Sequence, residues 1–457
     1  METWRPALAR TNGPAYAQIV DALAADIERG ALGRGAQLPT QRALAHQIGV
    51  GIGTVTRAYA AAEALGLIEA VVGRGSFVSA AASSQPAGDD GVIDLSRNIT
   101  PLAPASAALR AGFAALARRG DLAERLDYAP DGGFEADRRA GAAWLRRAAN
   151  LPDADEARLI VTAGAQQAIA VALGALTRPG DALIVEAATF NGLLLAARHA
   201  ALRIAPAAMD AEGLTPDALE RAARETGARV AYLQPFQNPT ARVMSLARRR
   251  DILATARRCG VTLIEDDLYG PHVADLGLPP LAALAPDEVT YVSGLSKSLA
   301  PGLRTGFLIP PARHRGAMLD VMRAATFGPP TLGAALATHW IESGAAFDIF
   351  GLMRCELAAR TDLATTQLAG LIEPLRHAIS PHVWMPLGEL DAERVAGLAM
   401  RAGVRVTAPA APFPAGTPID GLRLCLGPAR DIASLERAFA VLKGALSPGR
   451  ALSENVV

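Results

Sequence analysis

Lysine, cysteine and long apolar runs are scarce in this 457-residue chain. Only Lys297 and Lys443 are lysines, so arginine supplies nearly all of the 45 basic residues, which 45 Asp and Glu balance. With a net charge of zero there is no global field to attract polyanions. Any binding of nucleic acid must therefore depend on a few locally placed groups.

The features of secreted, membrane and metal-binding proteins are also missing. Residues 1–13 are polar and contain no apolar signal-peptide core. No uninterrupted apolar run reaches the roughly 18 residues that span a membrane. The three cysteines and seven histidines have no metal-ligand spacing. We therefore expect a cytoplasmic protein with free thiols, no membrane association and no metal site.

The composition changes over residues 79–92, where small, polar and turn-forming residues interrupt the helical apolar pattern. Such a segment is typical of a flexible linker. It separates an N-terminal unit, residues 1–78, from a large α/β body over 93–344 and a smaller α+β subdomain over 345–457. The sequence therefore predicts a multi-domain α/β protein.

The N-terminal unit has the pattern of three helices followed by a hairpin. Apolar residues recur at helical spacing over 14–29, from about 40 to 48, and over 52–65. Two short strands are predicted at 67–72 and 76–79. A helix-turn-helix with a hairpin wing is a DNA-reading arrangement.

From about residue 91 onward, apolar strands alternate with helices. The strands are predicted at 159–162, 182–186, 230–233, 262–265 and 289–292. Continuous apolar strands between helices indicate a mostly parallel sheet that is covered on both faces. Such a sheet presents its ligands at the carboxyl ends of its strands.

Lys297 is the most informative residue of the body. It lies within residues 293–304, just after a predicted strand, in a chain that otherwise uses arginine for positive charge. Arginine never offers a free amine, whereas a lysine that burial makes neutral can form a Schiff base. The alternative is an ordinary surface lysine.

Polar residues occur after four of the predicted strands. They are, in order, the Gly-containing turn 162–167, Asn238, Asp266 with Tyr269, and Lys297 with Arg304. Amides at a helix start bind anions, a buried carboxylate needs a cation such as a protonated pyridine nitrogen, and a guanidinium grips a phosphate. In this order they specify pyridoxal 5'-phosphate, whose known protein partners are a Schiff-base lysine and an Asp at the ring nitrogen. Taken singly, each could be an ordinary turn, or in the Asp-rich case a metal site.

On these motifs, residues 93–445 resemble the fold-type I aspartate aminotransferase family. The resemblance implies a seven-stranded, mostly parallel sheet with a smaller C-terminal subdomain, and pyridoxal 5'-phosphate as cofactor. It implies that Lys297 is the Schiff-base lysine, that Asp266 pairs with the ring nitrogen, and that Asn238 and Tyr269 hold the ring oxygen. Around the phosphate it implies Ala165, Gln166, Ser296 and Arg304.

Further matches to this family concern the ring, the partner subunit and the ligand. Phe190 matches the aromatic residue that stacks on the ring. Tyr128 resembles the tyrosine that reaches the phosphate in the other subunit, which implies a homodimer. Arg423 resembles the arginine that grips an amino acid's carboxylate, with a surface arginine as the alternative. Gly294 departs from the family, which usually has Ser or Thr three residues before Lys297.

Residues 14–78 resemble the GntR-type winged helix. The resemblance is carried by residues 13–16, 37–45, 53–59 and 73–78. Over residues 1–80 seven Arg stand against six Asp or Glu, a net charge of about +1, so DNA affinity must come from a few groups.

Five residues of this unit are predicted to contact double-stranded DNA. They are Arg42 at the start of the second helix, Thr54, Thr56 and Arg57 on the recognition helix, and Arg74 in the wing, which could enter a minor groove. For each arginine the alternative is a solvated surface charge. Gly51 stands where this family often has Ser.

A GntR-like head joined to an aminotransferase-like body resembles the MocR family of transcription regulators. The resemblance implies a homodimeric regulator that binds operator DNA and senses a small amino compound, or pyridoxal 5'-phosphate itself, through an internal aldimine at Lys297. The alternative is a pyridoxal-phosphate-dependent aminotransferase acting on an α-amino acid and a 2-oxo acid. A third hypothesis is a structural body without cofactor.

Overall fold

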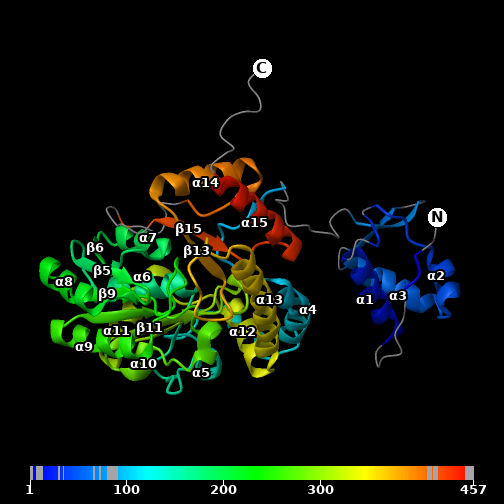
Figure 1. The fold of residues 1–457 in the computed structure, drawn as a ribbon. Helices are drawn as coiled ribbons and strands as arrows, with labels where there is room; N and C mark the ends of the chain where they lie inside the picture. The colour runs from blue at the N-terminus through cyan, green and yellow to red at the C-terminus, as the bar shows by residue number, and fades with distance from the viewer. Residues whose placement is uncertain are drawn as a thin grey trace. The chain divides into compact units, whose positions relative to one another are not determined.

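The structure, a computed structural model, describes residues 4–6, 14–28, 31–33, 35–64, 67–71, 74–79, 91–408, 414 and 420–447. The chain divides into two compact units, Met1–Gly91 and Val92–Val457 (Figure 1). Residues 80–90, most of the predicted linker, lie outside the described residues. Within the described ranges, no helix is long and apolar enough to cross a membrane.

The described part of the smaller unit is a three-helix head with a two-stranded antiparallel wing. Its elements are α1 (Ala15–Glu28), α2 (Gln41–Ile48), α3 (Ile52–Ala64), β1 (Ile68–Val71) and β2 (Gly75–Val78). The Thr40 hydroxyl accepts a hydrogen bond from the Ala43 amide at 3.2 Å and begins α2. Gly49, at φ 70°, ends this helix in the left-handed region. The predicted winged helix-turn-helix is confirmed.

A seven-stranded sheet forms the centre of the larger unit (Figure 1). Its strands are β4 (Ile160–Thr162), β5 (Ala182–Glu186), β6 (Arg203–Ala207), β9 (Val230–Leu233), β10 (Thr262–Asp266), β11 (Val289–Gly294) and β12 (Gly306–Ile309). Their order is β4-β12-β11-β10-β9-β5-β6. Only β12 runs antiparallel to its neighbours among these strands. The predicted mostly parallel seven-stranded sheet is confirmed.

Successive side chains of the strands enter two separate cores, as the two-residue period of a strand requires. Leu183 and Ile264 pack into one core, and their neighbours Ile184 and Leu263 into the other. The first core is closed by α6 (Ala165–Leu176), α7 (Asn191–His199) and α11 (Ala312–Thr326). The second is closed by α5 (Glu135–Ala148), α8 (Pro216–Thr226), α9 (Leu246–Cys259), α10 (Leu281–Leu284) and α12 (Thr331–Glu342).

The smaller subdomain has its own core and two short sheets. Its elements include α13 (Ala345–Gln367), β13 (His382–Pro386), α14 (Glu389–Arg401), β14 (Val404–Arg405), β15 (Gly421–Cys425) and α15 (Ile432–Leu446). β13 pairs with β15, and β14 pairs with β3 (Ile93–Asp94). The chain therefore contributes β3 to the smaller subdomain before it builds the large sheet, although the sequence-based boundaries place residue 93 in the large domain. α4 (Ala103–Leu116) packs on α12 and α13.

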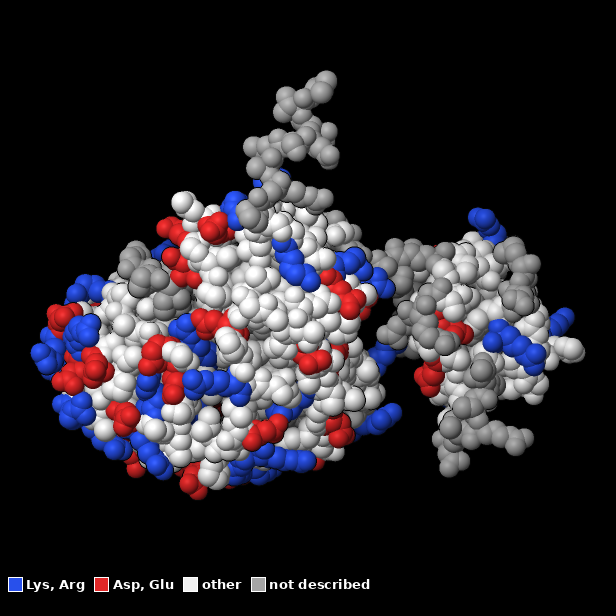
Figure 2. All heavy atoms as spheres, viewed as in Figure 1, with Lys and Arg blue, Asp and Glu red and all other residues white. Residues whose placement is uncertain are grey.

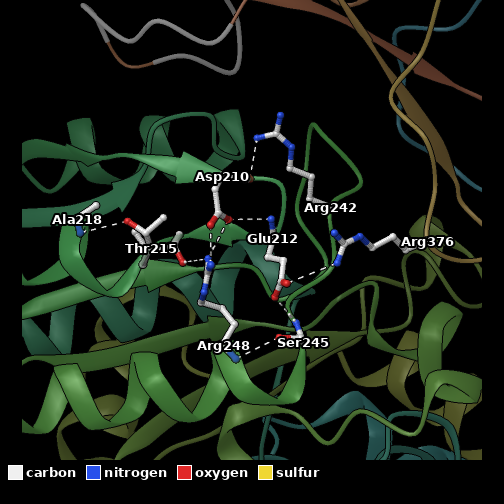
Figure 3. Close-up of polar contacts among 9 residues, drawn as sticks. Asp210, Glu212, Thr215, Ala218, Arg242, Ser245, Arg248 and Arg376 are labelled. Carbon is white, nitrogen blue, oxygen red and sulfur yellow. Dashed lines mark hydrogen bonds and ion pairs between the residues drawn. The ribbon is translucent and has the colours of Figure 1, made fainter. Parts of the chain in front are cut away.

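Short elements complete the larger unit. They are the 3-10 helices η1 (Leu122–Leu126), η2 (Gly270–Leu276) and η3 (Pro301–Leu303) and the hairpin of β7 (Met209–Asp210) and β8 (Gly213–Leu214). An ion-pair network ties this hairpin to the start of α9 (Figure 3). Arg248 donates to both carboxylate oxygens of Asp210, at 2.9 and 2.6 Å. Glu212 accepts from the Ser245 amide at 3.0 Å and pairs with Arg376, which precedes β13, at 3.5 Å.

Candidate cofactor site and DNA-binding face

Lys297 lies in the turn that follows β11. Its Nζ donates to the backbone oxygen of Asn98, and its own carbonyl oxygen accepts a hydrogen bond from His272 Nε2 at 2.9 Å. Burial lowers the pKa of Lys297 to about 8, although Cys425 and Asp266 nearby oppose this shift. At neutral pH the amine is therefore much closer to its nucleophilic form than an exposed lysine would be.

Asp266 ends β10 with its carboxylate buried. Its Oδ2 accepts hydrogen bonds from the Tyr232 hydroxyl at 2.5 Å and from Gln234 Nε2 at 3.3 Å, and its Oδ1 accepts from the Leu268 amide at 3.1 Å. Burial raises the pKa of Asp266, and these bonds together with Lys297 oppose the rise. A buried carboxylate of this kind is stabilised by a cationic partner, and a protonated ring nitrogen is one.

Tyr269 follows Asp266 by three residues and is buried in an aromatic cluster. Its ring lies edge-on to Phe236 and to His382, with centroid distances of 5.4 Å in both cases. Burial raises the pKa of Tyr269, so the hydroxyl keeps its proton and can donate a hydrogen bond at neutral pH.

Asn238 lies on the loop after β9, and Arg423 comes from β15 in the smaller subdomain. Arg423 Nη1 donates to Asn238 Oδ1 at 2.9 Å. Arg423 Nη2 donates to the Ser96 carbonyl at 2.9 Å and to the Thr407 hydroxyl at 3.0 Å, while its buried Nε has no hydrogen-bond partner among the described residues. Because the guanidinium occupies Oδ1, the amide nitrogen of Asn238 is the group left to donate to a ligand.

The turn before α6 brings backbone amides and a guanidinium together. Gly164 has φ 85°, and no side chain caps the helix that begins at Ala165. A Cβ at Gly164 would lie 2.9 Å from Arg304 Nη2, so only glycine lets the guanidinium approach this closely. Arg304 Nη2 also donates to the Ala163 carbonyl at 2.7 Å. The amides of Ala165 and Gln166 and the Arg304 guanidinium thus lie at one helix start, an arrangement whose donors suit a phosphate.

Phe190 precedes α7 and lies against the first turn of α6. Gln166 Nε2 donates to the Gly192 carbonyl at 2.7 Å. A Cβ at Gly192 would lie 2.3 Å from both the Phe190 ring and Gln166 Oε1, so the glycine allows these side chains to meet. Ser296 is half-buried and immediately precedes Lys297 in the turn after β11.

Tyr128 lies at the surface of the larger unit, with 78% of its area exposed. Its ring contacts that of Phe327, which is 69% exposed, at a centroid distance of 5.7 Å. Leu126 is also exposed. The single chain therefore leaves an apolar face uncovered around Tyr128.

These residues fit pyridoxal 5'-phosphate. Burial brings the pKa of the Lys297 amine close to neutrality, Asp266 presents a buried carboxylate, and Gly164 leaves room for Arg304 at an uncapped helix start. Arg423 Nε is a buried donor without a partner in the described part of the chain, which suits an acceptor that is brought in by a ligand.

Sequence reasoning missed several residues around Lys297, Asp266 and Tyr269. They are Asn98, Glu186, Tyr232, Gln234, His272 and His382. Glu186 is the clearest case, because burial raises its pKa to about 8 and its Oε1 has no hydrogen-bond partner among the described residues. Glu186 ends a strand that is otherwise apolar, and this position could have marked it as a site residue. No local pattern marks Asn98 and His382, which reach the site only through the packing of β3 and β13.

The head's predicted DNA-contact residues differ in their exposure and in their contacts with other residues of the head. Thr54 is half-buried, and the Thr56 hydroxyl donates to Gln41 Oε1 at 2.7 Å. The Arg57 guanidinium lies 4.2 Å above the centre of the Tyr16 ring. Both contacts hold side chains of α3 against other helices of the head.

Arg42 on α2 and Arg74 in the wing are exposed. Gln37 Nε2 donates to the Arg74 carbonyl at 2.9 Å, which orders the turn before β2. Gly75 follows at φ 109°, and a Cβ there would lie 3.3 Å from the same Gln37 amide. The wing turn therefore requires glycine beside its arginine.

Comparisons with known proteins agree with this geometry. The chain belongs to the aminotransferase class I and II family, whose model matches residues 90–442. Residues 15–78 match the model of bacterial regulatory proteins of the gntR family. Together these matches are the domain arrangement of MocR-type regulators, and they imply pyridoxal 5'-phosphate as the cofactor of the body.

Related proteins are similar over the whole chain or over the body. The uncharacterized HTH-type transcriptional regulator YdeF of Bacillus subtilis is 27% identical over 96% of each chain. The uncharacterized HTH-type transcriptional regulator YjiR of Escherichia coli is 28% identical over 72% of this chain and 76% of its own length. The crystal structure of an archaeal alanine:glyoxylate aminotransferase shares the fold of the body, with a TM-score of 0.70, 22% identity, and coverage of 77% of this chain and 90% of that one.

Proposed function

We propose that this protein is a DNA-binding transcription regulator that holds pyridoxal 5'-phosphate on Lys297 and senses a small amino compound. The observation that carries the proposal is a lysine with a pKa of about 8, beside Asp266 and Arg304, in the same chain as a winged helix-turn-helix. The cofactor, when bound, supplies a reactive aldehyde and an electron-withdrawing ring.

The chain's own residues have distinct roles in this proposal. Lys297 Nζ would hold the cofactor through its aldehyde carbon, the same atom that the amine of a ligand would seek. Asp266 holds the proton of the ring nitrogen, while Asn238 and Tyr269 donate to the ring oxygen and Phe190 covers a ring face. Ala165, Gln166, Ser296 and Arg304 bind the phosphate. Arg423 binds the carboxylate of the amino ligand.

Binding of double-stranded DNA is assigned to the head. On the face of the larger unit that Figure 2 shows, acidic and basic side chains are intermixed, and the chain as a whole has no net charge. In the proposal Arg42 and Arg74 contact phosphates or groove edges. Thr54, Thr56 and Arg57 contact the DNA from α3, which lies in the major groove.

The proposed active form is a cytoplasmic homodimer. Its support is the exposed apolar face around Tyr128, Phe327 and Leu126, which a second copy would cover. In this arrangement Tyr128 reaches the phosphate in the other subunit. The proposed domains are residues 1–78, a linker over 79–92, a large domain over 93–344 and a smaller subdomain over 345–457, to which β3 adds a strand by pairing with β14.

The proposal is tested in two steps on the full chain. Borohydride reduction after incubation with pyridoxal 5'-phosphate is expected to leave an adduct on the peptide containing Lys297, and Lys297→Ala is expected to remove it. Binding to the DNA upstream of the protein's own gene is expected to weaken steeply with salt and to change when an amino ligand is added. An adduct without any DNA binding contradicts the regulator.

A second candidate function is an aminotransferase acting on an α-amino acid and a 2-oxo acid. The observation that favours it is that the lysine, aspartate and two arginines of the site are all present in a single chain. The 2-aminoadipate transaminase of Thermus thermophilus is 28% identical over 53% of this chain. Sustained turnover of an amino acid with a 2-oxo acid would identify the enzyme, whereas one stoichiometric half-reaction would not.

A further inference from the structure

The solvent face of α3 carries small side chains around its start. The inner face comprises Val55, Ala58, Tyr59 and Ala62, all buried in the core of the head. On the other side Ile52, Gly53, Thr56, Arg57, Ala60 and Glu63 are exposed, and Ile52 begins the helix. Around Ile52 the exposed neighbours Gly51, Gly53 and Thr56 are small, so the start of the helix can approach the floor of the major groove, which is about 12 Å wide.

Two polar side chains at the centre of α3 contact other helices of the head. Thr56 bonds to Gln41 at 2.7 Å, and Arg57 lies over the ring of Tyr16 at 4.2 Å. These contacts fix where Thr56 and Arg57 lie, and a further contact with the bases can come from the start of the helix.

Ile52 is the one large apolar side chain on the outer face of α3 within the described residues, with 48% of its area exposed. It stands between Gly51 and Gly53, and a Cβ at either glycine would meet nothing within 4 Å. Its neighbours thus present only backbone, and the isoleucine projects beyond them at the first turn of the helix. The head's core is complete without this side chain, so its exposed surface is available to a ligand.

Resting on the proposed DNA-binding function, we propose that Ile52 is a specificity-determining residue that contacts the 5-methyl group of a thymine in the operator. Thymine displays this methyl group at the edge of the major groove, and apolar side chains read it by direct contact. The small outer residues of α3 and the two flanking glycines allow the approach. A thymine is therefore required at the base pair facing the start of α3 in each half-site.

The test uses the full chain and duplexes enriched by it from a random pool. In the enriched sequence, each thymine is replaced singly by uracil, which keeps the base pair and removes only the methyl group. At one position per half-site, affinity is expected to fall about fourfold, the factor that corresponds to one buried methyl group. Elsewhere the replacement is expected to have little effect.

Variants separate the contact from general effects on the head. Ile52→Ala is expected to bind the thymine and uracil duplexes equally, with an unchanged salt slope, whereas Ile52→Val keeps most of the preference. Leu390→Ala, which removes an exposed apolar side chain of the body, serves as the matched control and keeps the full preference. Thermal unfolding of each variant checks that the head stays folded.

The outcomes distinguish this inference from the function on which it rests. If duplexes are enriched but no thymine position responds to uracil, or if the response persists in Ile52→Ala, the inference is overturned and the regulator stands. If no duplex is enriched above the random pool, the regulator itself is contradicted and the inference falls with it.

Discussion

Arg423 Nη1 donates a hydrogen bond to Asn238 Oδ1 at 2.9 Å, and so joins β15 of the smaller subdomain to the loop after β9 of the large sheet. The residues are 185 positions apart in the sequence. One guanidinium thereby fixes the orientation of an amide in the proposed cofactor site and remains available to a ligand through Nε. In the proposed function this one guanidinium would both orient the Asn238 amide and contact the ligand.

Replacing Arg423 by Ala is expected to weaken carboxylate-bearing amines about tenfold or more, because charge-assisted hydrogen bonds contribute about 1.5–3 kcal/mol. The same variant is expected to shift the absorbance of the bound cofactor, since Asn238 loses its partner. Titration of that absorbance with amino acids measures both effects. Arg405→Ala, which breaks an ion pair with Asp94 at 3.3 Å in the same subdomain, is the control, and an equal loss there would contradict a specific role for Arg423.

Attachment of pyridoxal 5'-phosphate to Lys297 is expected to follow a pH curve with a midpoint near the lowered pKa of about 8. The neutral amine is the nucleophile, so the rate rises from pH 7 and levels off above pH 9. Stopped-flow absorbance measures this rate. Lys443→Arg should leave the curve unaltered, whereas Lys297→Arg should abolish attachment.

The same shift predicts how stability varies with pH in the cofactor-free protein. The folded pKa of Lys297 lies below its ordinary value of 10.5, so the unfolded chain binds the extra proton between about pH 8 and 10.5. The contribution of this site to stability therefore rises with pH across that window. Urea unfolding of wild type and Lys297→Met over this range should show a slope in wild type that the variant lacks.

Gly306→Ala is expected to destabilise the protein by about 1–3 kcal/mol, as overpacking of a core does. A Cβ there would lie 2.5 Å from the Gly164 carbonyl carbon and 2.6 Å from Thr162 Oγ1. Because Gly164 forms the proposed phosphate turn, cofactor affinity should fall as well. Gly316→Ala in α11 has open space around its Cβ and is expected to be neutral or stabilising. Chemical unfolding and cofactor titration compare the two.

Asp210 is expected to stabilise the β7–β8 hairpin at neutral pH and to lose this effect in acid. Its pKa is lowered, first by the hydrogen bonds from Arg248, so the contribution is present above the unfolded value near 3.8 and is lost as pH falls through the folded pKa. Because Asp210 is half-exposed, Arg248→Met should cost only about 0.5–1 kcal/mol at pH 7. Breaking the exposed pair of Arg224 and Glu220 should cost less, and equal costs at pH 7 and pH 3 would contradict the prediction.

The sequence alone determined the division into a winged helix-turn-helix and a parallel-sheet body. Apolar periodicity reflects which side of a helix or strand is buried, and this is written locally. Because parallel strands end at one edge of the sheet, the order of Asn238, Asp266 and Lys297 after successive strands also indicated a shared site. Gly294, which departs from the family's usual Ser or Thr, is explained only by the structure: it pairs with Gly306 across β11 and β12, and a Cβ there would lie 3.1 Å from the Gly306 Cα.

Only the tertiary structure decided which distant residues complete the site. Asn98 reaches Lys297, His382 reaches Tyr269, and Arg423 reaches Asn238 because β3, β13 and β15 of the smaller subdomain pack against the ends of the large sheet. It likewise determined that Arg57 lies on Tyr16 and that Ile52 is half-exposed at the start of α3. Such contacts depend on how whole elements pack, and no local pattern of the chain encodes them.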